Sequence, residues 1–373
     1  MKLLENYVYI KKEERKMKFA VIPWAEKYSN NEIFNVSSST NRNGLAEPYA
    51  EMKAYIDSTG NEINTIDRYP DLSEVDFFLF FDWFPKWIYK LSKMGLSSRM
   101  VYCNAEPPTV KSMNTYEGYK RVMRYFPYLM TWNKDIVDNR RIFYRTIPYY
   151  FTSHDDKVPF EDKKLLTSIS ANKKSDYVDE LYTEREKLIS YFEENMPDQF
   201  DMYGVGWDNT GHKSYKGSPE NKFDVYPNYK FALAFENTKN VRGYVTEKIF
   251  DCLSGGIVPI YYGAEDICDY VSEESFIDYR KFESLEKLKY FLENISKEEY
   301  EKYLRAGRDV VESGELRYQF SGRMYGENIF ELVKKAKLHD FNVKRRDLAL
   351  LILSDLFHKA ADKVRGLIRK LQF

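Results

Sequence analysis

The sequence predicts an α/β protein with two doubly wound domains, each a parallel sheet between layers of helices. Three observations lead to this prediction. A chain of 373 residues exceeds the usual size of a single domain. Along most of it, apolar runs of strand length alternate with segments of helical spacing, which is the pattern of parallel sheets. A polar, proline-bearing stretch at residues 153–164 separates two such sets and is typical of a linker.

The first domain is expected over residues 17–155, after an N-terminal extension of residues 1–16. Short apolar and aromatic runs predict its strands, at residues 19–24, 75–81, 100–104, 128–132 and 143–150. Between them, apolar residues recur every three or four positions and predict helices at residues 47–56, 85–94 and 113–125.

The second domain is expected over residues 156–342. The same two patterns predict strands at residues 165–170, 200–205, 231–235 and 258–262, and helices at residues 182–194, 245–253, 285–295, 297–313 and 323–337. Ligands of doubly wound folds bind beyond the carboxyl ends of the strands. We therefore expect the functional site in a cleft between the two domains.

The last segment, residues 343–373, differs from both domains. Its apolar residues recur at helical spacing, and eight Lys or Arg against three Asp give it a formal charge of +5. A basic amphipathic helix favours the surface of an anionic membrane. A C-terminal helix packed across the two domains fits the pattern equally well.

Composition narrows the class of protein. The formal net charge is −1, so no overall field favours nucleic acid. Three cysteines without a CxxC motif and four scattered histidines argue against a disulfide framework and a structural metal site. The N-terminus has no stretch apolar enough for a signal peptide or anchor. We expect a cytoplasmic protein, with the tail allowing peripheral contact with the inner face of a membrane.

One stretch, residues 229–264, combines strand, loop and helix signals with charged side chains. The apolar strand ends at Glu236–Asn237, and a polar loop with Gly243 follows. Thr246 is suited to cap the next helix, whose N-terminus and Lys248 would favour a diphosphate. Glu247 could accept hydrogen bonds from sugar hydroxyls. The same strand–loop–helix pattern also occurs in Rossmann-like proteins where such charges only match the helix dipole.

The motif FALAFEN…YVTEKIFDCLSGGIVPIYYG resembles that of the α1,3-fucosyltransferases, glycosyltransferase family 10. The likeness extends over roughly residues 102–280 and includes YCNAEPPTV and, more loosely, TWNKDI. This resemblance implies a GT-B fold and an inverting transfer from GDP-fucose. It also implies that Glu106 is the catalytic base and that the donor is bound by Arg185, Asn237, Tyr244, Glu247 and Lys248. For Arg185, the alternative is a solvated helix face.

The resemblance further implies that no metal is required, and the sequence contains no Asp-x-Asp motif, although stimulation by Mn²⁺ or Mg²⁺ would be compatible. The acceptor is expected to be a cell-surface glycan, N-acetyllactosamine-like or a lipopolysaccharide, fucosylated at O3 of GlcNAc or a similar sugar. Two alternatives remain. One is a GT-B enzyme that uses another nucleotide sugar, and the other is a non-catalytic, membrane-associated carbohydrate-binding protein.

Overall fold

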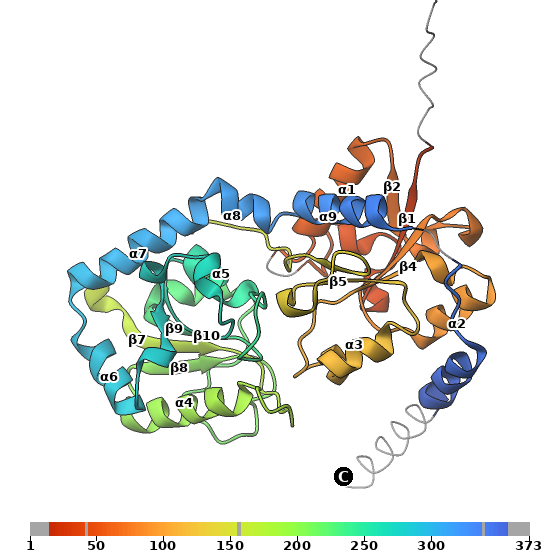
Figure 1. The fold of residues 1–373 in the computed structure, drawn as a ribbon. Helices are drawn as coiled ribbons and strands as arrows, with labels where there is room; N and C mark the ends of the chain where they lie inside the picture. Colours follow the sequence, from red (N-terminus) through yellow and green to blue (C-terminus); the bar gives the residue numbers. More distant parts are fainter. Residues whose placement is uncertain (1–14, 42–43, 155–157, 338–339, 357–373) are drawn as a thin grey trace, which may run out of the picture.

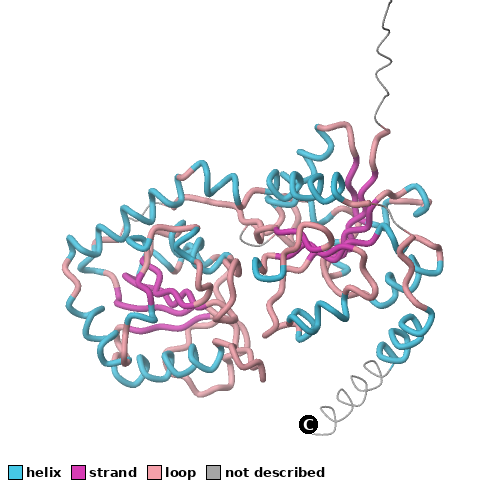
Figure 2. The backbone as a smooth tube through the Cα atoms, in the orientation of Figure 1, coloured by secondary structure: helices cyan, strands magenta, loops and turns pink. Residues whose placement is uncertain are grey.

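A computed structural model describes residues 15–41, 44–154, 158–337 and 340–356. The chain forms two lobes, each built around one parallel sheet (Figure 1). Strands lie at the centre of each lobe and helices lie on both sides of them (Figure 2). The predicted fold class, two doubly wound α/β domains, is confirmed.

The first sheet has six parallel strands in the order β2-β1-β3-β4-β5-β6. Its strands are β1 (Lys18–Ile22), β2 (Glu62–Thr65), β3 (Phe77–Phe80), β4 (Met100–Cys103), β5 (Tyr128–Thr131) and β6 (Ile142–Tyr144). Strands β3, β4 and β5 are buried along their whole length, because helices cover both faces of the sheet. The chain order reverses between β1 and β3, so this domain has one switch point at that position.

Two helix layers cover the first sheet. On one face, α2 (Pro85–Lys93) and α3 (Tyr116–Val122) bury Ile88, Leu91 and Val122. On the other face, α1 (Glu47–Ser58) packs with α9 (Gly322–Lys335), which is the last helix of the range assigned to the second domain. Figure 1 shows α9, in blue, beside α1. The structure thus differs from the proposed boundary: the chain returns to the first domain before residue 342.

The second sheet has five parallel strands in the order β11-β10-β9-β7-β8. Its strands are β7 (Lys164–Ile169), β8 (Phe200–Tyr203), β9 (Tyr229–Phe235), β10 (Val258–Tyr262) and β11 (Ile277–Asp278). One face is covered by α4 (Tyr182–Asn195) and α6 (Leu285–Asn294). The other is covered by α5 (Glu247–Ser254), with α7 (Lys297–Glu312) and α8 (Gly314–Gln319) outside it. The switch point lies between β7 and β9.

The C-terminal segment is helical over residues 345–356 and then passes beyond the described residues. Val343 and Leu351 are buried in the α2–α3 face of the first domain, and the Tyr125 hydroxyl donates to the Asp347 carbonyl at 3.1 Å. Leu353 and Leu356 of the apolar stripe are exposed. Over residues 345–356, the part that the structure describes, the helix packs on the first domain, and the rest of the predicted helix lies outside the described residues. Within the described part of the chain, no helix is both long and apolar enough to cross a membrane.

Candidate active site

Polar side chains gather where β9 ends, next to the β7–β9 switch point. Buried apolar residues carry the strand to Phe235, and Glu236 and Asn237 follow directly. A loop then leads to α5, which begins at Glu247 with Thr246 as its N-cap. Because parallel strands present their carboxyl ends to one edge, the start of α5 and the end of β9 meet at the place where doubly wound folds bind ligands.

Glu236 organises this turn from inside the protein. Its side chain has no exposed surface and accepts two hydrogen bonds from Thr246, from the backbone N–H at 2.9 Å and from the hydroxyl at 2.7 Å. Burial raises the pKa of Glu236, and the positive charge of Lys248 and the Thr246 donors oppose that rise. The sequence placed Glu236 at the end of the strand but gave it no role. A charged residue closing an apolar strand was the available signal.

Lys248 is half-buried and Glu247 is exposed, so these two residues form the part of the cluster that solvent reaches. The Lys248 ammonium lies 3.3 Å from Glu236 Oε2, 3.2 Å from Glu247 Oε1 and 3.1 Å from the Thr246 hydroxyl. Burial lowers the pKa of Lys248, but the two carboxylates outweigh it and hold this pKa above its usual range. Burial alone would raise the pKa of Glu247. The positive charges of Lys248 and Lys222 have the larger effect and lower this pKa to about 2. Half of the Glu247 side chain is nevertheless open to solvent, at 52% exposure.

Arg185 lies on α4 with only 4% of its surface exposed, so the solvated-face alternative is wrong. Its Nη2 donates to the carbonyls of Phe235 at 2.7 Å and Glu236 at 3.1 Å. The guanidinium therefore fixes the end of β9 and places a positive charge beneath the site.

Asn237 and Tyr244 stand on either side of the same loop. Asn237 Nδ2 donates to the Tyr244 hydroxyl at a long 3.4 Å. Tyr244 is buried, and burial raises its pKa well above the usual value. Its ring packs against Trp132 of the first domain, with centroids 4.7 Å apart.

Glu106 follows β4 on the first domain, in the segment Asn104–Pro108. Asn114 Nδ2 donates to the Glu106 carbonyl at 2.7 Å and to Asn104 Oδ1 at the same distance, which fixes the backbone of this turn. Glu106 is open to solvent, but the surrounding protein partly desolvates its carboxylate, and this desolvation raises its pKa. The charge of Lys173 lowers the pKa of Glu106, and the charge of Glu247 raises it.

These electrostatic partners place Glu106 within range of the second domain. Glu247, Lys248 and Lys173 all belong to that domain, and each influences the Glu106 carboxylate. Direct contacts between the domains lie nearby, such as the hydrogen bond of 3.0 Å from Ser175 Oγ to the Thr109 carbonyl. The structure thus brings the six residues singled out from the sequence to one region where the domains meet.

Sequence reasoning missed a second layer behind these residues. Lys222 forms an ion pair with the buried Asp251 of α5, which also accepts from the Tyr149 hydroxyl at 2.9 Å. Burial raises the pKa of Asp251 to about 6, against the opposing charge of Lys222. Lys222 also acts on Glu247. It lies nine residues before the motif begins at Phe231 and 25 residues before Glu247, and no pattern in the sequence links it to Glu247 or Asp251.

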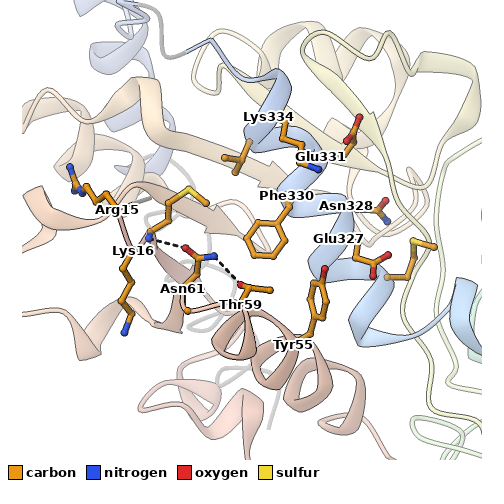
Figure 3. A pocket seen from close by; sticks show the side chains of 14 residues that line it. Arg15, Lys16, Tyr55, Thr59, Asn61, Glu327, Asn328, Phe330, Glu331 and Lys334 are labelled. Atoms are coloured by element: carbon orange, nitrogen blue, oxygen red, sulfur yellow. Dashed lines mark hydrogen bonds between the residues drawn. The ribbon is translucent and has the colours of Figure 1, made fainter. Parts of the chain in front are cut away.

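A separate cavity of about 920 Å³ lies where α1 and α9 meet the start of β1 (Figure 3). Its lining includes Tyr55, Asn61, Glu327 and Lys334, and it contains none of the predicted site residues. Over the part of the chain that is described, no group of three or more His, Cys, Asp or Glu side chains is arranged to hold a metal ion.

Comparisons with known proteins agree with the motif. Residues 161–318 match the model of the glycosyltransferase family 10 (fucosyltransferase) C-terminal domain. An alpha-(1,4)-fucosyltransferase of Arabidopsis thaliana is 43% identical over 84 residues, which are 21% of this chain and 21% of that protein. The alpha-(1,3)-fucosyltransferase FucT of Helicobacter pylori is 39% identical over 75 residues, 19% of this chain and 16% of that protein. The chain thus aligns with about a fifth of the length of these relatives.

A crystal structure of an α1,3-fucosyltransferase with GDP superposes on this chain with a TM-score of 0.55. The superposition covers 90% of this chain and 94% of that one, at 14% sequence identity. The likeness extends through both domains and confirms the predicted GT-B arrangement. Residues 161–318, which form most of the second domain, are thus similar to the C-terminal domain of glycosyltransferase family 10, the fucosyltransferase family.

Proposed function

We propose that this protein is an inverting fucosyltransferase, which transfers L-fucose from GDP-β-L-fucose to a hydroxyl of a glycan and forms an α-linkage. The observation that carries the proposal is the position of Glu106. It is a carboxylate of the first domain that lies in the electrostatic range of Glu247 and Lys248 of the second. The match of residues 161–318 to the fucosyltransferase family supports GDP-fucose as the donor.

In this mechanism Glu106 accepts the proton of the acceptor hydroxyl. The acceptor oxygen forms a bond to C1 of fucose while the bond from C1 to the diphosphate oxygen breaks, and GDP leaves from the opposite face. A single displacement of this kind inverts C1. A general base is most effective when its pKa approaches the working pH, and burial moves the pKa of Glu106 in that direction.

The leaving diphosphate gains charge as the bond breaks, and positive groups fixed in advance stabilise it. Lys248 and the N-terminus of α5 would contact the phosphates, since helix N-termini and ammonium groups both favour anions. Arg185 would add charge from below while holding the end of β9. Asn237 and Tyr244 would also help to stabilise the diphosphate, and Glu247 would accept hydrogen bonds from the ribose or fucose hydroxyls.

Transfer by these residues requires no resident metal. We propose that activity persists in EDTA, and that Mn²⁺ or Mg²⁺ at most stimulates it. Loss of activity in EDTA that either ion restored would contradict this part of the proposal.

The acceptor is proposed to be an N-acetyllactosamine-like glycan or a lipopolysaccharide, modified at O3 of GlcNAc or a similar sugar. The aligned relatives are named for both α1,4 and α1,3 linkages, so the shared segment does not set the linkage. We also propose that the basic C-terminal segment binds the inner face of a membrane. The exposed side chains of Leu353 and Leu356 support this, because an amphipathic helix binds a membrane surface through its apolar face.

A thermal-shift panel with GDP, UDP, GDP-fucose and GDP-mannose tests the donor. We expect GDP and GDP-fucose to raise the unfolding temperature and UDP to leave it unchanged, since only bound ligands stabilise the folded state. Stabilisation by UDP would support a transferase for another nucleotide sugar, and stabilisation by none would favour a carbohydrate-binding protein. A glycan screen with GDP-fucose, followed by linkage analysis, then identifies the acceptor.

A further inference from the structure

Trp132 is buried at the end of β5, with no exposed surface, and it contacts the turn that carries Glu106. Its indole Nε1–H donates to the Ala105 carbonyl at 3.1 Å. The Asn104 N–H donates in turn to the Met130 carbonyl at 2.8 Å. The residue before the proposed base is therefore held by a side chain from the next strand.

The same tryptophan also reaches the second domain. Its ring lies 4.7 Å from the ring of Tyr244, at an interplanar angle of 53°. Gly243 sits against its backbone with φ of +88°, and a Cβ at that position would lie 2.1 Å from the Trp132 carbonyl oxygen. A side chain at position 243 could not approach so closely, so the loop before α5 is shaped to fit Trp132.

An ion pair beside Trp132 holds the two domains at this point. The Lys134 ammonium lies 2.6 Å from Asp266 Oδ2, and Asp266 Oδ1 accepts from the Gly243 N–H at 2.8 Å. The Lys134 N–H donates to the Arg242 carbonyl at 3.3 Å. Asp266 thus joins the loop of Gly243 to the segment after Trp132.

We propose that Trp132 is a positioning residue, which couples the loop carrying Glu106 to the loop that precedes Lys248. The inference rests on the proposed function, because it gives Trp132 the task of setting the base against the donor. Trp132 contacts the Ala105 carbonyl and the Tyr244 ring. Ala105 directly precedes Glu106, and Tyr244 lies on the loop that leads to Lys248. Displacing a reacting group by about 1 Å can lower the rate on the order of 100-fold, so such a residue affects turnover more than binding.

Trp132→Phe tests the coupling, because phenylalanine keeps an aromatic ring against Tyr244 and removes the Nε1–H that holds Ala105. We expect kcat for fucosyl transfer to fall by about tenfold or more, with the Kd for GDP within about twofold of the wild type. The acid limb of the kcat profile should also move to lower pH, since a looser Glu106 is better solvated. Tyr69→Phe is the matched control, because it removes a buried hydrogen bond of 2.9 Å to the Phe19 carbonyl in the same domain. It should change neither kcat nor the acid limb of the kcat profile.

Hydrogen exchange gives a readout that does not need turnover. Trp132→Phe should raise amide exchange in residues 243–248 of the second domain. Gly243→Ala should raise exchange at Ala105 and Glu106 in the first. Exchange that rises only in the mutated domain, or an unchanged kcat and pH profile in Trp132→Phe, overturns the proposal. If the wild type transfers no fucose, the proposed function fails, whereas the exchange results still decide whether the two loops are coupled.

Discussion

The ammonium group of Lys248 lies 3.3 Å from a carboxylate oxygen of Glu236, a side chain with no exposed surface. The same carboxylate accepts from the backbone and the hydroxyl of Thr246, the residue that caps α5. One buried acid therefore sets both the start of the helix and the position of the cation at its first turn. The donor side of the site is built around this pair.

Replacing Glu236 with alanine should destabilise the protein. Alanine leaves the N–H and the hydroxyl of Thr246 without their acceptor and Lys248 without one of its two carboxylates, and removing one partner of a buried ion pair commonly costs about 3 kcal/mol. Urea unfolding should show a loss of on the order of 3 kcal/mol at neutral pH. A loss below about 0.5 kcal/mol would mean that Glu236 does not hold this turn together.

Lys248→Ala should weaken GDP binding by about tenfold to 100-fold, because a charge-assisted hydrogen bond contributes roughly 1.5–3 kcal/mol. Isothermal calorimetry with GDP measures this directly. Lys230→Ala serves as the control, since Lys230 lies near the start of β9, at the other end of that strand from the site, with its ammonium 3.7 Å from the Phe160 ring centre. GDP affinity that is equal in the two variants would remove Lys248 from the phosphate site.

The pH dependence of transfer should report the raised pKa of Glu106. Only the carboxylate accepts a proton, and burial makes Glu106 hold its proton up to a higher pH than an ordinary glutamate does. We expect kcat/KM to fall as pH decreases through this raised pKa, with the midpoint above the usual glutamate range. A profile that stays flat down to the range of an ordinary carboxyl would contradict this assignment.

The C-terminal segment allows a truncation that separates packing from membrane binding. Removing residues 357–373 deletes five Lys or Arg and one Asp but keeps Val343 and Leu351, which are buried in the first domain. The shortened protein should fold and transfer fucose to a soluble acceptor, and it should lose sedimentation with anionic vesicles. Neutral vesicles provide the control. Equal sedimentation of both proteins with anionic vesicles would exclude this segment as the membrane contact.

The sequence pattern predicted the strands that are buried on both faces, such as β4 and β9. A strand that helices cover on both faces is apolar along nearly its whole length, and such short apolar runs stand out in the sequence. The pattern missed β2 and β11. Strand β2 has the sequence EINT and lies at the edge of the sheet, and three of its four residues are polar, so it lacks the apolar run by which the other strands are predicted. The return of α9 to the first domain was also missed, since an amphipathic helix shows which of its faces is apolar but not which sheet that face covers.

For the site, the motif located the residues at the end of β9 and the start of α5 because they are contiguous in the chain. Glu236 was visible there, and its role depended on burial, which only the fold determines. Trp132 and Lys222 lie in other segments and reach the site through packing. Their contributions could not be inferred from spacing, because no local pattern distinguishes a core tryptophan from one that joins two loops.

Glu106→Gln tests whether Glu106 is the base of the transfer reaction, when GDP-fucose turnover and GDP affinity are measured on the same protein. Burial disfavours the charged form of Glu106, so the neutral amide should not lower stability. We predict that transfer falls by roughly 100-fold to 10,000-fold, the range that a general base supplies, while the Kd for GDP stays unchanged. A variant that still transfers fucose at the wild-type rate would contradict it.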